Sequence, residues 1–182
     1  MPTESLHPMT SIKSRRLGHT GFDVSEVGLG CWQIGGDWGE TSDDTAVAIL
    51  QAACDAGVRF FDTADVYGGG RSERLIGNFL RSLDGPKPRV ATKFGRDGGY
   101  PDGYTKDAMR RGIEGSLERL GVAQLDLVQL HCIPTEILRR GEVFDWLRTF
   151  QEEGLILHFG ASVETIEEGH IALKQEGLLS LQ

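Results

Sequence analysis

Four side chains that can move or hold a proton stand at comparable places along this 182-residue sequence. Asp62 follows the apolar pair Phe60-Phe61, and Tyr67 comes five residues later, directly before three glycines. Lys93 and His131 each close another apolar segment further along the chain. A carboxylate, a phenol, an ammonium and an imidazole together suit proton-transfer chemistry. Each residue alone is common in cores and turns, so their repeated position is the informative feature.

Short apolar segments alternate with amphipathic ones in the rest of the chain. The pattern predicts a hairpin (14–17 and 22–26), strands at 27–30, 58–62, 89–94, 125–130, 155–161 and 178–182, and helices at 43–56, 72–80, 104–120, 141–153 and 165–175. The first helix should bury Ala46, Val47, Leu50, Ala53 and Cys54. Such alternation predicts a parallel sheet, which a doubly wound fold and a (β/α)₈ barrel would both satisfy.

The proton-transfer residues favour the barrel. All four stand at or just after the carboxyl ends of predicted strands, and in a (β/α)₈ barrel these ends meet around one active face. Lys93 carries the most weight, because a lysine inside an apolar strand is costly to bury without a partner. Asp62 on the neighbouring strand is the expected partner. A lysine that reaches water and a histidine that belongs to the core are the structural alternatives.

The composition restricts the class of protein. A net charge of -8 and a pI near 5.1 argue against a nucleic-acid surface. No segment is apolar enough to span a membrane, and Cys31, Cys54 and Cys132 have no disulfide spacing, so we expect a soluble, cytoplasmic protein. His131 and Cys132 would point to opposite faces of a strand, so we expect no metal site. The glycine-rich stretches lack the dinucleotide and phosphate-loop patterns.

The sequence resembles the aldo-keto reductase superfamily from about Arg15 to Gln182. The resemblance is carried by four motifs in order, which are Phe61-Asp62-Thr63-Ala64-Asp65-Val66-Tyr67-Gly68, Ala91-Thr92-Lys93, Gln129-Leu130-His131 and Gly160-Ala161-Ser162. It implies an α/β fold, a parallel (β/α)₈ TIM barrel with an N-terminal β-hairpin, here incomplete at about six strands. Residues 14–182 would form this domain, after a flexible N-terminus at 1–13.

The resemblance also implies roles for residues. Tyr67 would protonate a small-molecule carbonyl, and a nicotinamide cofactor, NADP(H) or alternatively NAD(H), would supply the hydride. A phenol titrates near pH 10 in water, so the Lys93 ammonium would be needed to stabilise the tyrosinate. The implied sites are catalytic Asp62, Tyr67, Lys93 and His131, cofactor-binding Ser162, Gln182, Gly30 and Cys31, and Trp32 at the substrate pocket.

Two departures from the family pattern matter. Val163 stands where the family often has Asn, and the chain lacks about two β/α units of a barrel that needs about 250 residues. We therefore expect open barrel edges that favour self-association or a complementing fragment, and weak binding of NADPH. The alternative functions are a catalytically silent fragment or binding module of the same fold, and an aldolase that forms a Schiff base on Lys93.

Overall fold

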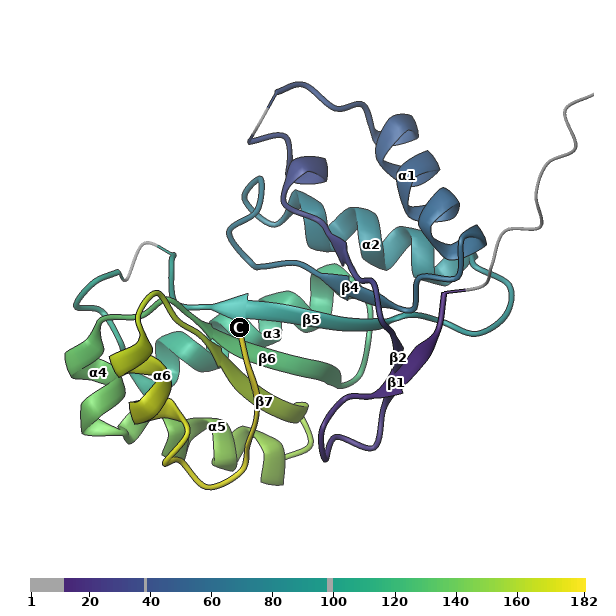
Figure 1. Ribbon diagram of the computed structural model, residues 1–182. Coiled ribbons are helices and arrows are strands. Elements are labelled where there is room, and N and C mark those ends of the chain that lie inside the picture. The colour runs from purple at the N-terminus through teal and green to yellow at the C-terminus, as the bar shows by residue number, and fades with distance from the viewer. Residues whose placement is uncertain (1–11, 38, 98–99) are drawn as a thin grey trace, which may run out of the picture.

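The computed structural model describes residues 12–37, 39–97 and 100–182, and most of the predicted flexible N-terminus lies outside them. Its centre is a six-stranded parallel sheet in the order β3-β4-β5-β6-β7-β8 (Figure 1). The strands are β3 (Leu29–Gly30), β4 (Phe60–Asp62), β5 (Arg89–Phe94), β6 (Leu125–His131), β7 (Ile156–Ser162) and β8 (Leu178–Leu181). Each strand pairs with the next one in the sequence, which excludes the doubly wound alternative, because that fold reverses its strand order.

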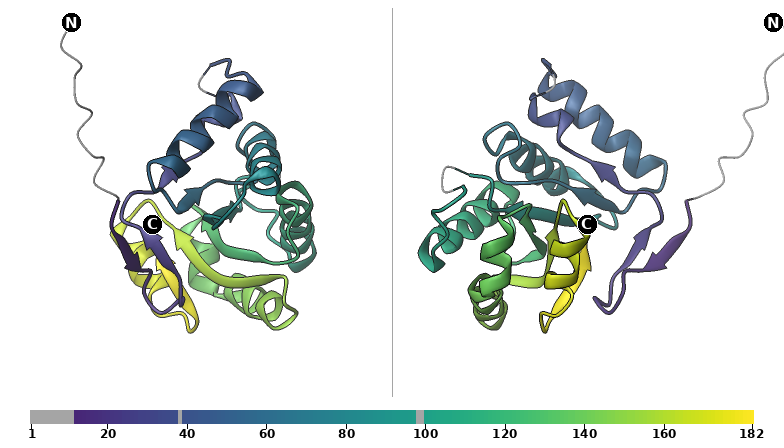
Figure 2. Two further views of the ribbon diagram at one scale, coloured as in Figure 1. Left: turned by 90° about the vertical axis from the view of Figure 1, so that its right-hand side faces the viewer. Right: turned by 60° about the vertical axis from the view of Figure 1, so that its left-hand side comes forward.

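The sheet curls with its helices on the outer side, as Figure 2 shows, and forms an incomplete (β/α) barrel. The helices are α1 (Asp43–Asp55), α2 (Arg71–Ser82), α3 (Lys106–Leu120), α4 (Thr135–Arg140), α5 (Glu142–Glu152) and α6 (Ile166–Ala172), with a 3₁₀ turn at Gln33–Gly35. Phe61, Phe144, Phe150 and Phe159 are fully buried and belong to the core that the sheet shares with these helices. The predicted incomplete barrel is thereby confirmed.

A β-hairpin lies at the amino-terminal end of the sheet, as predicted. Strands β1 (Ser14–Arg16) and β2 (Asp23–Ser25) pair antiparallel. The turn between them touches β7, where a ring nitrogen of His158 lies 2.8 Å from the Thr20 carbonyl oxygen. The Phe22 and His158 rings meet edge to face, with centroids 5.0 Å apart. These contacts hold the hairpin against the sheet at the end opposite the predicted site.

Local sequence signals explain where the helices begin. Ser42, Thr105 and Thr165 cap α1, α3 and α6, each accepting a hydrogen bond from a backbone N–H in the first turn. Thr165 and Glu168 form a complete capping box. Gly121 ends α3 in the left-handed conformation at φ 67°, which glycine adopts without steric cost. Most helix boundaries were therefore predictable to within a few residues.

The structure differs from the prediction in two details. No element was predicted between His131 and Gly141, where Thr135–Arg140 forms α4, and Gly141 at φ 80° separates α4 from α5. Val47 was expected in the core, yet it is 39% exposed. The core face of α1 is formed by Ala46, Leu50 and Cys54, at a spacing of four, and Val47 lies beside that face. None of the described helices is long and apolar enough to cross a membrane.

Candidate active site

The predicted lysine pair forms the centre of the site. Lys93 is 2% exposed, and its ammonium donates to the Asp62 carboxylate at Oδ1 and to the Thr63 carbonyl oxygen at 3.0 Å. Its third partner is the Tyr67 hydroxyl, 3.4 Å from Nζ. The expected contacts of Lys93 with Asp62 and Tyr67 are thus confirmed. A buried ammonium with three oxygen partners is held in one position and keeps its charge compensated.

The register of the sheet explains this convergence. In the β4–β5 pairing Asp62 lies opposite Ala91, so Lys93 stands two residues further toward the carboxyl end, on the same face as Ala91. Its long side chain can therefore reach Asp62 and the loop after β4. The loop that carries Tyr67 turns through Gly68, whose φ is +59°. A Cβ atom on Gly68 would lie 2.0 Å from the Gly35 carbonyl oxygen, so only glycine fits there.

His131 joins the group from the end of β6. Its ring meets Tyr67 edge to face, with centroids 5.8 Å apart and planes at 83°. Burial, with the positive charges of Lys93 and Arg96, lowers the pKa of His131 to about 4. The imidazole is therefore neutral at physiological pH and can donate one N–H while accepting at the other nitrogen. Its Nδ1 is buried without a hydrogen-bond partner among the described residues.

Trp32 packs against the phenol ring of Tyr67. The Trp32 and Tyr67 rings are stacked, with centroids 5.5 Å apart and an interplanar angle of 14°. Asp37 fixes this arrangement, because its Oδ2 accepts from Trp32 Nε1 at 3.1 Å and from the Gly68 N–H at 2.9 Å. An open cavity of about 550 Å³ is lined here by Trp32, Asp37, Val66, Tyr67, Arg96, His131, Cys132 and Glu164. The predicted pocket residue therefore does line a cavity together with Tyr67 and His131.

The predicted cofactor residues fall into two groups. Gln182 donates from Nε2 to Asp62 Oδ2 at 3.1 Å, and Ser162 pairs with His131 in the β6–β7 register. Both therefore stand beside the tetrad, the group formed by Asp62, Tyr67, Lys93 and His131. Gly30 pairs with Asp62 at the edge of the sheet.

Cys31 differs, because its side chain is fully buried and its backbone N–H and C=O are bonded to Asp62 and Ser72. Burial, with the negative charge of Asp62, raises the pKa of its thiol to about 12. The cofactor role of Cys31 stays a prediction that its position does not support.

Several residues of the site were not found from the sequence. Arg96, Asp37 and Glu164 line the cavity but stand on loops, where no strand pattern singles out a residue. Asp65 lies between Asp62 and Tyr67, and its Oδ1 is buried without a hydrogen-bond partner among the described residues. Burial, with the charges of Glu73 and Asp97, raises the pKa of Asp65 to about 7. The sequence offered one signal for Asp65, which is an acidic residue placed between two apolar residues.

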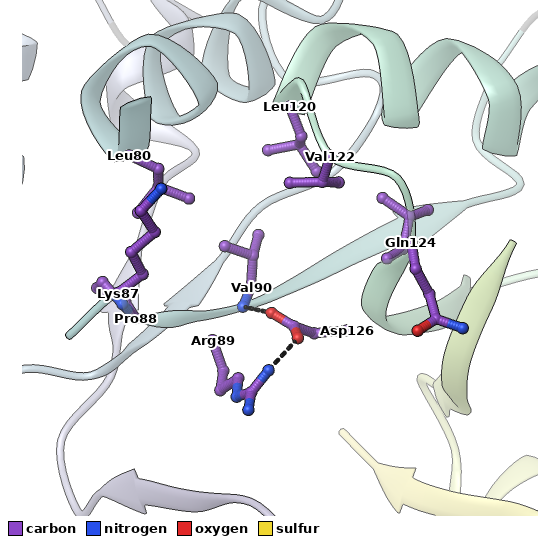
Figure 3. Close-up of a pocket in the computed structure, with 10 residues that line it drawn as sticks. Leu80, Lys87, Pro88, Arg89, Val90, Leu120, Val122, Gln124 and Asp126 are labelled. Atoms are coloured by element: carbon purple, nitrogen blue, oxygen red, sulfur yellow. Dashed lines mark hydrogen bonds and ion pairs between the residues drawn. The ribbon is translucent and has the colours of Figure 1, made fainter. Parts of the chain in front are cut away.

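A second cavity lies at the other end of the sheet, at the start of β5 and β6 (Figure 3). It has a volume of about 190 Å³ and a mainly aliphatic lining, with Leu80, Val90 and Leu120 among its residues. Asp126 at its border accepts from Arg89 at 2.6 Å and from the Val90 N–H at 3.0 Å, as the dashed lines show. The described residues contain no cluster of three or more metal-ligating side chains. The four side chains of the predicted catalytic site lie away from this cavity, at the carboxyl end of the sheet.

Known proteins resemble this chain in sequence. L-galactose dehydrogenase of Arabidopsis thaliana is 38% identical over 152 residues, which cover 80% of this chain and 47% of that protein. Pyridoxal 4-dehydrogenase of Microbacterium luteolum is 31% identical over 212 residues, covering 93% and 61%. The chain thus spans about half to three fifths of the length of these relatives.

Solved structures resemble this chain in fold as well as in sequence. An aldo-keto reductase from Bacillus halodurans in its holo form matches with a TM-score of 0.80 at 28% identity, covering 93% of this chain and 56% of that one. The glycerol dehydrogenase of Gluconobacter oxydans matches with a TM-score of 0.76 at 31% identity, covering 93% and 54%. The sequence model of the aldo/keto reductase family matches residues 26–179, a span that contains the four converging side chains. The chain therefore belongs to the aldo/keto reductase family.

Proposed function

We propose that this chain carries the carbonyl-binding and proton-donating site of a nicotinamide-dependent reductase, which converts an aldehyde or ketone to an alcohol. The observation that carries the proposal is the buried Lys93 ammonium, which bonds to Asp62 and lies 3.4 Å from the Tyr67 hydroxyl. Family membership supports an oxidoreductase. A purely structural lysine would not need a phenol at the border of an open cavity.

In this proposal Tyr67 gives its hydroxyl proton to the carbonyl oxygen of the substrate. The neighbouring Lys93 ammonium stabilises the tyrosinate that remains, because an opposite charge favours the ionised form. Asp62 and the Thr63 carbonyl oxygen hold Lys93 in place, so Asp62 is a positioning residue. The stack with Trp32 limits the movement of the phenol. The proton donor Tyr67, the supporting Lys93 and the stacked Trp32 then form one preorganised group.

His131 would orient the substrate. A neutral imidazole can donate an N–H to the carbonyl oxygen without adding a charge beside Lys93. Its Nδ1 is buried away from solvent and has no partner among the described residues, so the substrate would have to accept from the other ring nitrogen, Nε2, on the side of His131 that lines the cavity. Because a carbonyl oxygen held by both Tyr67 and His131 is polarised, its carbon becomes open to hydride attack.

The cofactor would be NADP(H), with NAD(H) as the alternative. The fit is supported at the nicotinamide end, where the Gln182 amide and Ser162 stand beside the tetrad and can bond a carboxamide. Gly30 lies at the same end of the sheet. When bound, the nicotinamide supplies the hydride, and the protein supplies position and a proton. Lys93 is committed to three oxygen partners, which disfavours the Schiff-base alternative.

Incubation with NADPH and 4-nitrobenzaldehyde tests this proposal. We expect a fall in absorbance at 340 nm, matched by formation of 4-nitrobenzyl alcohol. Tyr67→Phe should lower the rate by about 100-fold or more, because it removes the proton donor. A folded chain that forms no alcohol at saturating NADPH would contradict the proposal and favour the silent binding module. Borohydride trapping of a substrate on Lys93 would favour the aldolase.

We also propose that the chain associates through its open side at α6 and β8. Ile166 is 82% exposed, Leu173 60% and Leu181 43%, and they line one open apolar groove with Gly169 and Val163. Large exposed apolar patches commonly mark interfaces. Sedimentation of the chain and of an Ile166→Ser, Leu173→Ser variant tests this, with association expected only in the wild type.

A cytoplasmic location stays a proposal, supported by three cysteines that form no disulfide.

A further inference from the structure

Arg96 is held in a defined position at the mouth of the site. It follows β5, directly after Gly95, whose carbonyl oxygen accepts from the Tyr104 hydroxyl at 2.7 Å. Its guanidinium carbon lies 4.9 Å from the centroid of the Tyr100 ring, and its Nη2 bonds to Glu164 Oε1 at 2.9 Å. An arginine supported by an aromatic face and a carboxylate loses little freedom when it binds a ligand.

Arg96 faces the space that the reacting carbonyl would enter. It lines the same cavity of about 550 Å³ as Tyr67 and His131. The positive charge of Arg96 acts on His131, because Arg96 and Lys93 both contribute to the lowered pKa of that imidazole. A ligand with one end on Tyr67 and His131 would therefore have a second cation available along the cavity wall.

The acidic neighbours leave Arg96 able to bind. A guanidinium has five N–H donors in a planar fork, more than the single Glu164 oxygen to which Arg96 bonds can occupy. The Glu164 side chain is 65% exposed, so it can move toward water when a ligand arrives. Asp37, the other acid that lines the cavity, already accepts two hydrogen bonds, from Trp32 and Gly68. Arg96 is thus the group of this cavity best suited to hold an anion.

We propose that Arg96 is a specificity-determining residue that selects carbonyl substrates bearing a second, carboxylate group. The inference rests on the proposed function, because it places the carbonyl on Tyr67 and His131. The carboxylate would form a two-point contact with the guanidinium, the geometry in which Arg recognises carboxylates. Glu164 would hold Arg96 in the absence of substrate and compete with the substrate for it.

A purely structural role for Arg96 makes a different prediction. If the ion pair only ties the loop after β5 to the loop after β7, then loss of either partner has the same consequence. If Arg96 recognises the substrate, loss of Arg96 and loss of Glu164 have opposite effects on the preference for a carboxylate. Removing Arg96 removes the anion site, whereas neutralising Glu164 removes its competitor.

The experiment compares 4-carboxybenzaldehyde with its neutral isostere 4-carbamoylbenzaldehyde as the ratio of their kcat/KM values. Arg96→Gln should lower this ratio by about 10-fold or more, as expected for a lost charge-assisted hydrogen bond, and Arg96→Lys should retain part of it. Glu164→Gln should raise the ratio. Arg139→Gln breaks an exposed ion pair with Glu167, outside the cavity, and should leave the ratio unchanged. An unchanged ratio in Arg96→Gln, or a fall in both Arg96→Gln and Glu164→Gln, would overturn the inference.

Calorimetric binding of the same two aldehydes separates this inference from the proposed reaction. We expect the wild type to bind 4-carboxybenzaldehyde more tightly than the amide, and Arg96→Gln to lose that difference. Selective binding without alcohol formation would contradict the reductase while supporting the role of Arg96. Turnover without any dependence of the ratio on Arg96 would support the reductase and overturn this inference.

Discussion

Strand β5 takes part in two buried polar networks on its opposite faces, and the networks differ in their surroundings. Lys93 points to the inner side, where it bonds to Asp62 and Tyr67 beside an open cavity. The preceding residue, Thr92, points the other way and donates to Glu73 Oε1 at 2.5 Å. Glu73 also accepts from Arg119 Nε at 2.6 Å, which connects β5, α2 and α3. Neighbouring side chains of one strand thus take part in two separate polar networks.

The difference lies in what each network can still do. Glu73 is fully buried, and both of its oxygens already accept hydrogen bonds from the protein, so this network holds elements together. The Asp62 side chain is 20% exposed, and the phenol next to Lys93 lines a cavity. A buried ion pair is by itself weak evidence of function. Access to a ligand is what distinguishes the Lys93 pair from the Glu73 pair.

The largest expected loss of stability follows removal of Glu73. Glu73→Ala leaves the Arg119 guanidinium and the Thr92 hydroxyl without their carboxylate, a change that typically costs about 3–5 kcal/mol. Urea unfolding would measure it. Glu167→Ala, which removes an exposed partner of Arg139, is the matched control and should cost less than about 1 kcal/mol. Equal losses in the two variants would show that the outer pair is not a structural connection.

Removal of Asp62 should cost less than removal of Glu73. Asp62→Ala leaves Lys93 with the Thr63 carbonyl oxygen as a remaining acceptor, and the cavity beside it can admit water. We expect a loss of about 2 kcal/mol in the free energy of unfolding, in the range for one buried group that loses a partner. A thermal melt identical to that of the wild type would mean that Lys93 does not depend on this pair.

Asp65 lies between the two networks and predicts a pH effect. Its N–H donates to the Lys93 carbonyl oxygen at 3.2 Å, and burial, with the charges of Glu73 and Asp97, raises its pKa to about 7. In the unfolded chain the pKa of an aspartate is about 3.9, the value found in peptides. Between these values the folded protein holds a proton that the unfolded chain has lost, so this group lowers stability as the pH rises from about 4 to 7.

Asp65→Asn should therefore be more stable than the wild type at pH 8, by about 1–3 kcal/mol, the usual penalty of an unsatisfied buried group. The difference should shrink toward pH 4, where Asp65 is protonated in both states. Urea unfolding of the two proteins across this pH range measures it. A constant difference at all pH values would contradict the proposed protonation of Asp65.

The smallest expected effect concerns the wall of the inner site. Trp32→Ala removes the ring stacked on Tyr67, and such aromatic pairs contribute about 0.5–1.5 kcal/mol beyond buried area. Trp32 is 43% exposed, so its removal uncovers less apolar surface than the loss of a fully buried aromatic residue would. We expect the free energy of unfolding, measured by urea unfolding, to fall by no more than this contribution. A loss as large as that of Glu73→Ala would place Trp32 among the structural residues.

The sequence predicted the inner network better than the outer one. Lys93 stood out because a lysine in an apolar strand needs a partner, and the strand order named Asp62. Glu73 and Arg119 gave no such signal, because charged residues on amphipathic helices usually face water. Their contact depends on how α2 and α3 pack, which no local pattern encodes. Arg96 and Glu164 were not predicted for a related reason, because loop conformation decides whether they face the cavity.

The most direct test compares turnover per folded molecule in Asp62→Asn and Glu73→Gln. Both changes are isosteric and remove one carboxylate charge, on the inner and outer sides of the sheet respectively. With NADPH and 4-nitrobenzaldehyde, and with the folded fraction measured by circular dichroism, we expect Asp62→Asn to lose about 100-fold in kcat through the misplaced Lys93. Glu73→Gln should stay within about threefold of the wild type, a difference below about 1 kcal/mol. Equal losses in the two variants would contradict the assignment of chemistry to the inner network.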